Sequence, residues 1–361
     1  MSATWGTNIE LSIFGESHGK AIGVVIGNLP AGIALDMEAI KKDMGRRAPG
    51  KNKMSTARKE SDEVEIISGV IDNITTGAPL TGLIYNSDQH SKDYSYLKEL
   101  MRPGHSDYSA YEKYHGFNDV RGGGHFSGRL TAPIVFAGSI AKQILKQMGI
   151  QVGAHIKSIK DIEDDSFGID VNEEILNDLL LQEYPTINKE KYTLMKKTIE
   201  QARINQNSVG GMIECAIINV PAGIGNPFFD SIESHLSPLL FSIPAVKSVS
   251  FGIGEEITNL LGSEANDSYY IDNGVVKAKT NHNGGILGGI SNGMPITFKV
   301  GIKPTPSISL KQETINVKTK QNAILEVKGR HDPCIVPRAI VVVEAMAALG
   351  ILDILGYERL K

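Results

Sequence analysis

The sequence predicts an α+β fold in which helices pack against antiparallel sheets in one pseudo-symmetric body. Short apolar runs bounded by turn residues indicate strands, and apolar residues at helical spacing indicate helices. Two motifs also recur in the same order along the chain. Residues 28–33 (NLPAGI) return as 219–224 (NVPAGI), and residues 77–81 (GAPLT) return as 293–297 (GMPIT). Each copy stands beside a predicted strand, which favours a duplicated unit of sheet and helices over a parallel Rossmann sheet.

Composition excludes several classes of protein. The 361 residues are 41% hydrophobic and 22% charged, with a formal net charge of −4, so the chain is neither disordered nor collagen-like. Its negative charge argues against a nucleic-acid-binding protein. The two cysteines, Cys215 and Cys334, form neither a disulfide framework nor a metal-ligand spacing, which predicts a cytoplasmic protein without a bound metal. Glu344 and Asp353 interrupt the most apolar run, so we expect a buried helix and no membrane partner.

The first two predicted strands, residues 9–14 and 21–26, flank a hairpin tip with the sequence GESHGK. Glycines on both sides of Glu16, Ser17 and His18 predict that these side chains point outward. A functional histidine and a merely solvated one are equally compatible with this pattern.

A helix is predicted next, capped by Asp36 and ending at Arg46 and Arg47. These arginines either complement the helix dipole or begin a basic segment suited to an anionic ligand.

The remaining elements follow from periodicity. Strands are expected at 64–74, 80–86, 212–220 and 245–251, a hairpin at 269–279, and helices from Leu130 and Pro337. Residues 161–206 are rich in Lys, Glu, Asn and Gln and contain two amphipathic patterns, at 172–183 and 188–205. We predict a peripheral helical insertion there, within a single domain that spans residues 1–361.

The segment from Arg102 to Arg129 is polar, rich in glycine and almost free of apolar residues. It contains RPGHSDY at 102–108 and RGGGHFSGR at 121–129. Three consecutive glycines allow positive φ and let backbone N–H groups approach a ligand. A glycine loop before a helix N-terminus is a ready anion site, and arginines bind phosphate or carboxylate. The alternative is a mobile surface loop.

Three further polar clusters lie near the end of the chain, at 281–293, 303–307 and 329–334. In the last, Asp332 follows Arg330 and His331, and it is either structural or a general base. The chain contains no Walker motif, dinucleotide fingerprint, nucleophile elbow or zinc signature. Arginines, separated histidine clusters and glycine loops together indicate a large, multiply anionic ligand and proton-transfer chemistry.

Eight motifs in order resemble the chorismate synthase family over nearly the whole chain, although residues 161–206 carry little of the resemblance. The motifs are GESHG (15–19), RRAPG (46–50), RPGHSDY (102–108), RGGG (121–124), SVGG (208–211), GGILGGIS (284–291), KPT (303–305) and GRHDPC (329–334). The resemblance implies a β-α-β sandwich with helices between antiparallel sheets. It also implies a carbon–oxygen lyase that eliminates phosphate and the C6 proton, in an anti-1,4 sense, from 5-enolpyruvylshikimate 3-phosphate. The product would be chorismate, the last common intermediate of the shikimate pathway to aromatic amino acids, and reduced FMN would be required without net redox change.

The resemblance also assigns site residues by position. His18 and His105 match the two catalytic histidines, one assisting phosphate departure and the other protonating the reduced flavin. Asp332 matches an aspartate thought to act through the flavin N5 in removing the C6 proton. The implied substrate-binding residues are Arg46, Arg47, Arg129 and Arg338. The implied flavin contacts are His125, Phe126, Ser127, Ala245, Gly288, Lys303, Pro304, Thr305, Pro306, Ser307 and Arg330. Arg47 and Lys53 match NADP-binding positions.

The sequence departs from the family pattern at three positions. His125 stands where many members have arginine, Pro244 where some have asparagine, and Lys53 where some have an arginine linked to NADPH. These departures concern flavin contacts and any use of NADPH as the reductant. The compact chain resembles members that depend on an external flavin reductase, and the family implies a homotetramer in the cytoplasm.

Two other classes of function remain open. A flavin- or nicotinamide-dependent reductase would use similar loops and arginines but would show net redox turnover. A non-catalytic anion- or RNA-binding module would require interleaved aromatics and a basic total charge, and the sequence has neither.

Overall fold

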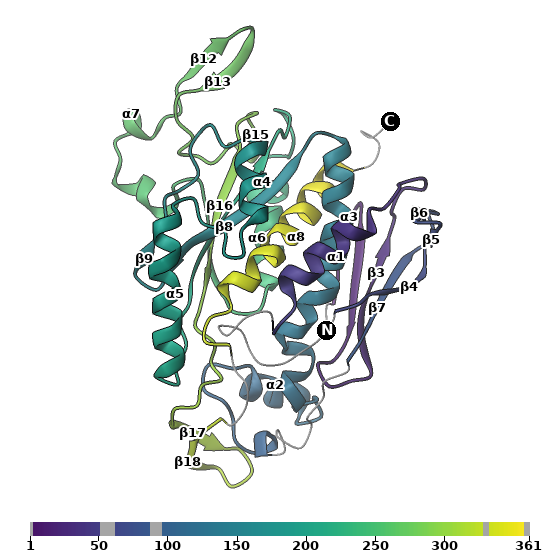
Figure 1. The fold of residues 1–361 in the computed structure, drawn as a ribbon, viewed down its shortest axis with the longest axis vertical. Coiled ribbons are helices and arrows are strands. Elements are labelled where there is room, and N and C mark those ends of the chain that lie inside the picture. Colours follow the sequence, from purple (N-terminus) through teal and green to yellow (C-terminus); the bar gives the residue numbers. More distant parts are fainter. Residues whose placement is uncertain (1–2, 51–61, 87–95, 328–331, 357–361) are drawn as a thin grey trace.

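The computed structural model describes residues 3–50, 62–86, 96–327 and 332–356. Two five-stranded antiparallel sheets enclose a layer of helices (Figure 1). The first sheet has the order β1 (Thr4–Trp5), β2 (Glu10–Gly15), β3 (Ala21–Gly27), β7 (Leu80–Tyr85), β4 (Glu65–Ser68). The second has the order β11 (Val246–Phe251), β16 (Ile296–Ile302), β10 (Gly211–Ile218), β8 (Gln151–Ile159), β9 (Ile162–Glu163). The predicted α+β class, with helices between antiparallel sheets, is confirmed.

Helices and small hairpins complete the fold. The helices are α1 (Met37–Arg47), α2 (Asp107–Tyr114), α3 (Thr131–Gln147), α4 (Glu173–Leu181), α5 (Lys189–Ile204), α6 (Ile232–Ser242), α7 (Gly262–Ala265) and α8 (Val336–Leu355). The hairpins are β5–β6 (Val70–Ile71, Ile74–Thr75), β12–β13 (Tyr269–Asp272, Val275–Ala278), β14–β15 (Ile286–Leu287, Ile290–Ser291) and β17–β18 (Gln312–Asn316, Gln321–Leu325). The predicted helix cap is present, since the Asp36 carboxylate accepts hydrogen bonds from the Glu38 and Ala39 amides, both at 3.0 Å.

The two halves of the chain repeat one unit. The series β2, β3, α1, β4, β5–β6, β7, α3 is followed by its counterpart β8, β10, α6, β11, β14–β15, β16, α8. The repeated motifs make matching contacts. The Thr75 hydroxyl donates to Pro30 O at 2.6 Å, and the Ser291 hydroxyl donates to Pro221 O at 2.6 Å. The predicted duplication is therefore present in the backbone and not only in the sequence.

Helix α8 lies at the centre of the molecule, and nearly every residue along it is buried. It packs against α3, where a Cβ added to Gly138 would lie 2.2 Å from the Cβ of Ala345. The two helices therefore approach as closely as glycine permits. Across the described residues, no helix has the length and apolar character needed to cross a membrane.

Two sequence expectations need comment. The strand expected at 64–74 is wrong as a single element, because Gly69 adopts φ +84° and separates β4 from β5. Residues 161–206 form β9, α4 and α5, and the two helices lie on the outer side of the second sheet (Figure 1). Leu176 and Leu179 pack against Ala216 and Ile218 there.

Candidate active site

The hairpin tip between β2 and β3 is buried rather than exposed. Ser17 and His18 are 0% and 3% exposed, so the expectation that their side chains point outward is wrong. The reason is a distant segment, the 3₁₀ helix η2 (Arg121–Phe126), which covers the tip. The Ser17 amide donates to Gly124 O at 3.1 Å, and His18 Nδ1 lies 3.3 Å from the Ser17 hydroxyl.

The three glycines of η2 adopt positive φ, as predicted, with values of 56°, 87° and 54°. They permit close approach to two histidines. A Cβ on Gly122 would lie 2.2 Å from His18 Cε1, and a Cβ on Gly123 would lie 3.3 Å from His105 Nε2. The two predicted catalytic histidines, far apart in sequence, therefore flank adjacent glycines.

His105 belongs to a cluster at the start of α2. Its Nδ1 lies 2.6 Å from Asp107 Oδ1. Arg102 donates to both oxygens of the same carboxylate, through Nε at 2.7 Å and Nη2 at 2.8 Å. Burial raises the pKa of Asp107, but hydrogen bonds from Arg102 and His105 outweigh it and hold that pKa well below its usual range. Asp107 thus contacts Nδ1 of His105, while Nε2 of the same ring faces Gly123.

Several predicted flavin contacts are linked to the segment that precedes His105. Lys303 Nζ donates to Gly104 O, and Ser307 Oγ accepts from Arg102 Nη1 at 3.2 Å. The Lys303 amide donates to Ala245 O at 3.0 Å, and Ala245 adopts φ +73°, an uncommon conformation outside glycine. These contacts therefore link Lys303, Ser307 and Ala245 to Arg102 and Gly104, which precede His105.

The motif at residues 208–211 contacts two of the predicted site loops. Ser208 Oγ donates to Thr305 O at 2.7 Å, and the Val209 amide donates to Pro333 O at 2.9 Å. It therefore links the loop of Lys303–Ser307 to the segment that carries Asp332.

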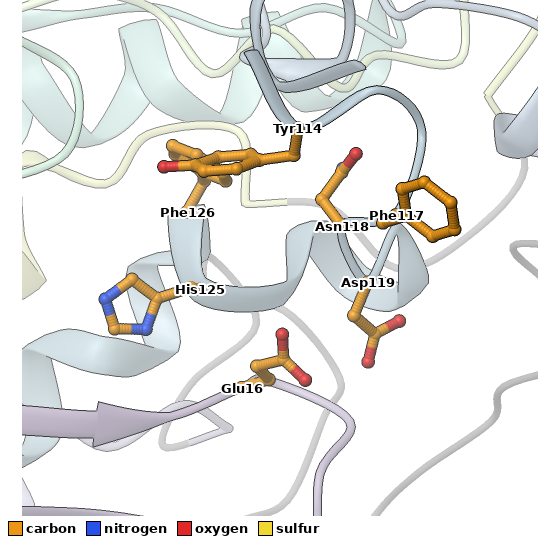
Figure 2. Close-up of a pocket in the computed structure, with 7 residues that line it drawn as sticks. All are labelled: Glu16, Tyr114, Phe117, Asn118, Asp119, His125 and Phe126. Carbon is orange, nitrogen blue, oxygen red and sulfur yellow. The ribbon is translucent and has the colours of Figure 1, made fainter. Parts of the chain in front are cut away.

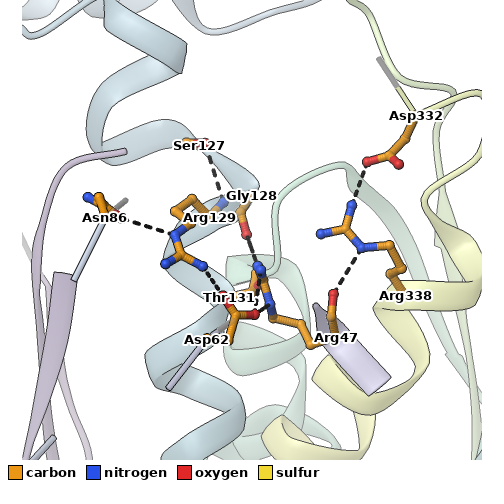
Figure 3. Close-up of polar contacts among 9 residues, drawn as sticks. All are labelled: Arg47, Asp62, Asn86, Ser127, Gly128, Arg129, Thr131, Asp332 and Arg338. Carbon is orange, nitrogen blue, oxygen red and sulfur yellow. Dashed lines mark hydrogen bonds and ion pairs between the residues drawn. The ribbon is translucent and has the colours of Figure 1, made fainter. Parts of the chain in front are cut away.

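Three arginines, Arg129, Arg47 and Arg338, lie in a row (Figure 3). Arg47 donates to Asp62 Oδ2 through Nε at 2.8 Å, and Arg129 Nη1 pairs with the other oxygen, Oδ1. Arg338 donates through Nε to Arg47 O at 2.9 Å and through Nη1 to Asp332 at 2.6 Å. Burial, the main cause, lowers the pKa of Arg47 to about 10.

Asn86 connects this arginine row to the hairpin tip. Its Oδ1 accepts from Arg129 Nε at 3.1 Å, while its Nδ2 donates to Glu16 O at 3.1 Å and to Gly19 O at 2.9 Å. The Asn86 side chain thus links Arg129 to the loop that carries His18.

Arg46 lies in the helical layer instead. It forms a double hydrogen bond to the fully buried Glu344, at 2.6 and 2.7 Å, and Lys142 and Asp43 complete the ion-pair network. Burial alone would lower the pKa of Arg46, but Glu344 and Asp43 outweigh it and raise that pKa. Its guanidinium therefore ties α1, α3 and α8 together, and its predicted contact with substrate stays a prediction.

A cavity of about 260 Å³ borders η2. Figure 2 shows the rings of Tyr114 and Phe126 on one side of it and the carboxylate of Glu16 on the other. His125 also lines the cavity, and its Nδ1 lies 2.8 Å from Gly15 O. Two predicted flavin contacts, His125 and Phe126, thus line a cavity that has aromatic rings on one side and a carboxylate on the other.

Some predicted residues are not brought to this site. Gly288 is in the β14–β15 turn, whose Gly289 contacts Ser231, before the start of β16. Lys303 follows the other end of β16, a strand of 7 residues that spans about 20 Å at 3.3 Å per residue. Lys53 and Arg330 lie outside the described residues.

Sequence reasoning missed three residues that hold the site together, Asp62, Asn86 and Asp107. Asp62 stands in the polar run KESDE, which is typical of a solvated surface. Asp107 did carry a signal, because it follows His105 by two residues within the motif RPGHSDY (102–108).

Among the described residues, no group of three or more His, Cys, Asp or Glu side chains is placed to hold a metal ion.

The chain is similar to known proteins along nearly its whole length. A family model described as chorismate synthase matches residues 9–355. A chorismate synthase of Lachnoclostridium phytofermentans is 48% identical, covering 98% of this chain and 95% of that protein. One from Thermococcus gammatolerans is 45% identical and covers 96% of both. A crystal structure of chorismate synthase superposes with a TM-score of 0.77 at 28% identity, over 99% of this chain and 94% of that one. The chain therefore belongs to the chorismate synthase family.

Proposed function

We propose that this protein converts 5-enolpyruvylshikimate 3-phosphate into chorismate by anti-1,4-elimination. The carbon–oxygen bond to phosphate and the C6–H bond break, and a ring double bond forms, so the overall reaction neither gains nor loses electrons. The observation that carries the proposal is the pair of histidines, His18 and His105, flanking Gly122 and Gly123, with Asn86 linking the arginine row to the hairpin tip.

The arginines suit the substrate, which carries a phosphate and two carboxylates. Arginine forks bind such groups with charge-assisted hydrogen bonds, which are strong where water is excluded. Arg47 and Arg129 are 3% and 5% exposed, so they lie in a largely desolvated region. Fixed charges in such a region stabilise the departing phosphate better than bulk water does.

The two histidines and Asp332 would handle the protons. His105 is oriented by Asp107 at Nδ1, which leaves Nε2 as the atom that can give or take a proton. His18 is buried beneath η2, close to the segment that carries Arg129. Asp332 is held by Arg338 at 2.6 Å, which fixes the carboxylate that we propose takes part in removing the C6 proton.

The residues also fit reduced FMN. Lys303 provides a cation beside Gly104, and the cavity next to η2 offers Tyr114 and Phe126 to a flat ring. We propose that His125–Ser127, Ala245 and Lys303–Ser307 hold the flavin, with Arg330 as a further contact. When bound, reduced FMN would supply electron density to the substrate as phosphate departs.

We further propose a cytoplasmic homotetramer that receives its flavin from an external reductase. Gly288 lies in the β14–β15 turn before β16, whereas Lys303 follows β16, and this separation along the chain supports a flavin contact that is supplied by another copy of the chain. Size-exclusion chromatography with light scattering should give four copies, and a monomer would remove this part of the proposal. Use of NADPH through Arg47 and Lys53 stays a prediction.

The test is an anaerobic incubation with chemically reduced FMN and 5-enolpyruvylshikimate 3-phosphate. Phosphate and chorismate should appear in equal amounts while the flavin stays reduced. Substrate-dependent oxidation of the flavin without phosphate release would instead indicate a reductase. A second reaction with NADPH and oxidised FMN should give no product until a flavin reductase is added.

A further inference from the structure

Asp62 lies at the centre of the arginine row. It is 2% exposed, and two arginines share its carboxylate. Oδ2 accepts from Arg47 Nε at 2.8 Å and lies 2.8 Å from Arg47 Nη2, while Oδ1 pairs with Arg129 Nη1. Because each oxygen of this carboxylate pairs with one arginine, Asp62 fixes the distance between the guanidinium groups of Arg47 and Arg129.

This arrangement opposes a strong repulsion. Burial is the largest influence that lowers the pKa of Arg47, and the charges of Arg338 and Arg129 lower it further, while Asp62 acts in the opposite direction. Like charges repel more strongly in a low-dielectric interior than in water. Without Asp62, Arg47 and Arg129 would therefore separate.

The influence of Asp62 extends to the third arginine. Arg338 Nε donates to the backbone oxygen of Arg47, at 2.9 Å, and Arg338 Nη1 holds Asp332. In Figure 3 these contacts form a continuous line from Asn86 to Asp332, with Asp62 near its middle.

The backbone at Asp62 is held in a less favourable conformation. Its φ of +51° lies in the left-handed region, which aspartate tolerates at a cost. The ion pairs to Arg47 and Arg129 are the contacts that hold the carboxylate at this position.

We propose that Asp62 is a positioning residue that sets Arg47, Arg129 and, through the Arg47 backbone, Arg338 for binding an anionic group of the ligand. Naming that group as the phosphate or a carboxylate of the substrate rests on the proposed function. The anion site itself does not depend on turnover.

Binding of inorganic phosphate, measured by titration calorimetry below the melting temperature of each variant, tests the proposal. Asp62→Asn should weaken phosphate binding at least tenfold, although it makes the protein more positive by one charge. Asp62→Glu keeps the carboxylate but lengthens the side chain, so its affinity should lie between those of the wild type and Asp62→Asn.

Asp353→Asn is the matched control. Asp353 is a buried, hydrogen-bonded carboxylate at the far end of α8 from Arg338, about 20 Å away at 1.5 Å per residue. Its loss should lower the melting temperature without changing phosphate affinity.

Several outcomes would overturn the proposal. Unchanged phosphate affinity in Asp62→Asn, with only a lower melting temperature, would make Asp62 purely structural. Tighter phosphate binding would make Asp62 a competitor for the arginines. Absence of phosphate binding in the wild type would remove the anion site. If Asp62→Asn does not fold, wild-type affinity in Asp62→Glu would overturn the proposal.

Kinetics then separate this inference from the proposed function. If the elimination occurs, Asp62→Asn should raise KM for the substrate about tenfold and change kcat less. If no elimination occurs but phosphate binding still depends on Asp62, the proposed function fails while the positioning role stands.

Discussion

His105 Nδ1 lies 2.6 Å from the carboxylate of Asp107, and that carboxylate is gripped on both oxygens by Arg102. These hydrogen bonds prevent rotation of the Asp107 carboxylate, which therefore fixes the orientation of the His105 ring. The ring can then present only Nε2 to a ligand near Gly123.

Asp107→Asn should therefore lower kcat by about 10²-fold, the lower end of what a positioned acid or base contributes. The amide no longer fixes the tautomer of His105, although it preserves the shape of the side chain. The anaerobic assay with reduced FMN measures the effect. Asp272→Asn is the control, since Asp272 pairs with a cation, Lys277, on the exposed β12–β13 hairpin. Equal kcat in the wild type and Asp107→Asn would exclude this orienting role.

Gly122→Ala should separate the cost of backbone strain from the displacement of His18. An alanine with positive φ costs about 1–2 kcal/mol, and the new Cβ would also meet His18 Cε1 at 2.2 Å. Gly149→Ala is the control, because Gly149 adopts φ +77° and has no atom within 4 Å of the added Cβ.

Both variants should lose stability in thermal unfolding, whereas only Gly122→Ala should lose kcat, at least tenfold. A kcat for Gly122→Ala that matches Gly149→Ala would mean that the position of His18 is not critical.

The sequence predicts the local features of this fold better than its distant contacts. The repeated motifs, the cap at Asp36 and the positive φ of residues 122–124 depend on neighbouring residues, and all are present. The burial of His18 depends on η2, about a hundred residues later in the chain, and no pattern near His18 reports it.

Arg46 and Arg47 illustrate the same limit. They are adjacent in one motif, but successive residues of a helix point about 100° apart. Arg46 therefore enters the helical layer and meets Glu344, while Arg47 turns towards Asp62. Glu344 and Asp62 both lie outside that motif, so a motif match assigns both arginines to the ligand without distinguishing them.

Glu344→Gln should destabilise the protein by about 3 kcal/mol, because it leaves the partly buried Arg46 and Lys142 short of one negative charge. Replacing both members of the main pair, in Arg46→Met with Glu344→Met, should recover much of that loss, since no uncompensated charge remains there. Urea unfolding measures both effects.

A double variant as unstable as Glu344→Gln would contradict this account of the ion pair. Its KM for the substrate also decides the predicted role of Arg46, since a raised KM would place the guanidinium in ligand binding.

His155 should make stability depend on pH between neutral and mildly alkaline conditions. The ring is fully buried, with Nδ1 3.0 Å from Asp164 and Nε2 2.9 Å from Glu214. Burial lowers the pKa of His155, but the hydrogen bonds that the ring donates to both carboxylates, and their charges, outweigh it and raise that pKa above 6.5. A histidine whose pKa is raised in the folded state stabilises the fold. This stabilisation is fully present below pH 6.5, the unfolded-state pKa, and is lost as the pH rises through the folded-state pKa.

Urea unfolding from pH 6 to 9 should therefore show wild-type stability falling with pH, and a flatter curve for His155→Gln, which carries no ionisable ring. His115→Asn is the control, because His115 is exposed and Asn tolerates its left-handed backbone, φ +54°. The curve of this control should run parallel to that of the wild type. Parallel curves for the wild type and His155→Gln would mean that the imidazole is neutral between its two carboxylates. Asp164 would still accept hydrogen bonds from the Ile187 and Asn188 amides, at 2.7 and 2.9 Å, and so link the segment after β9 to the start of α5.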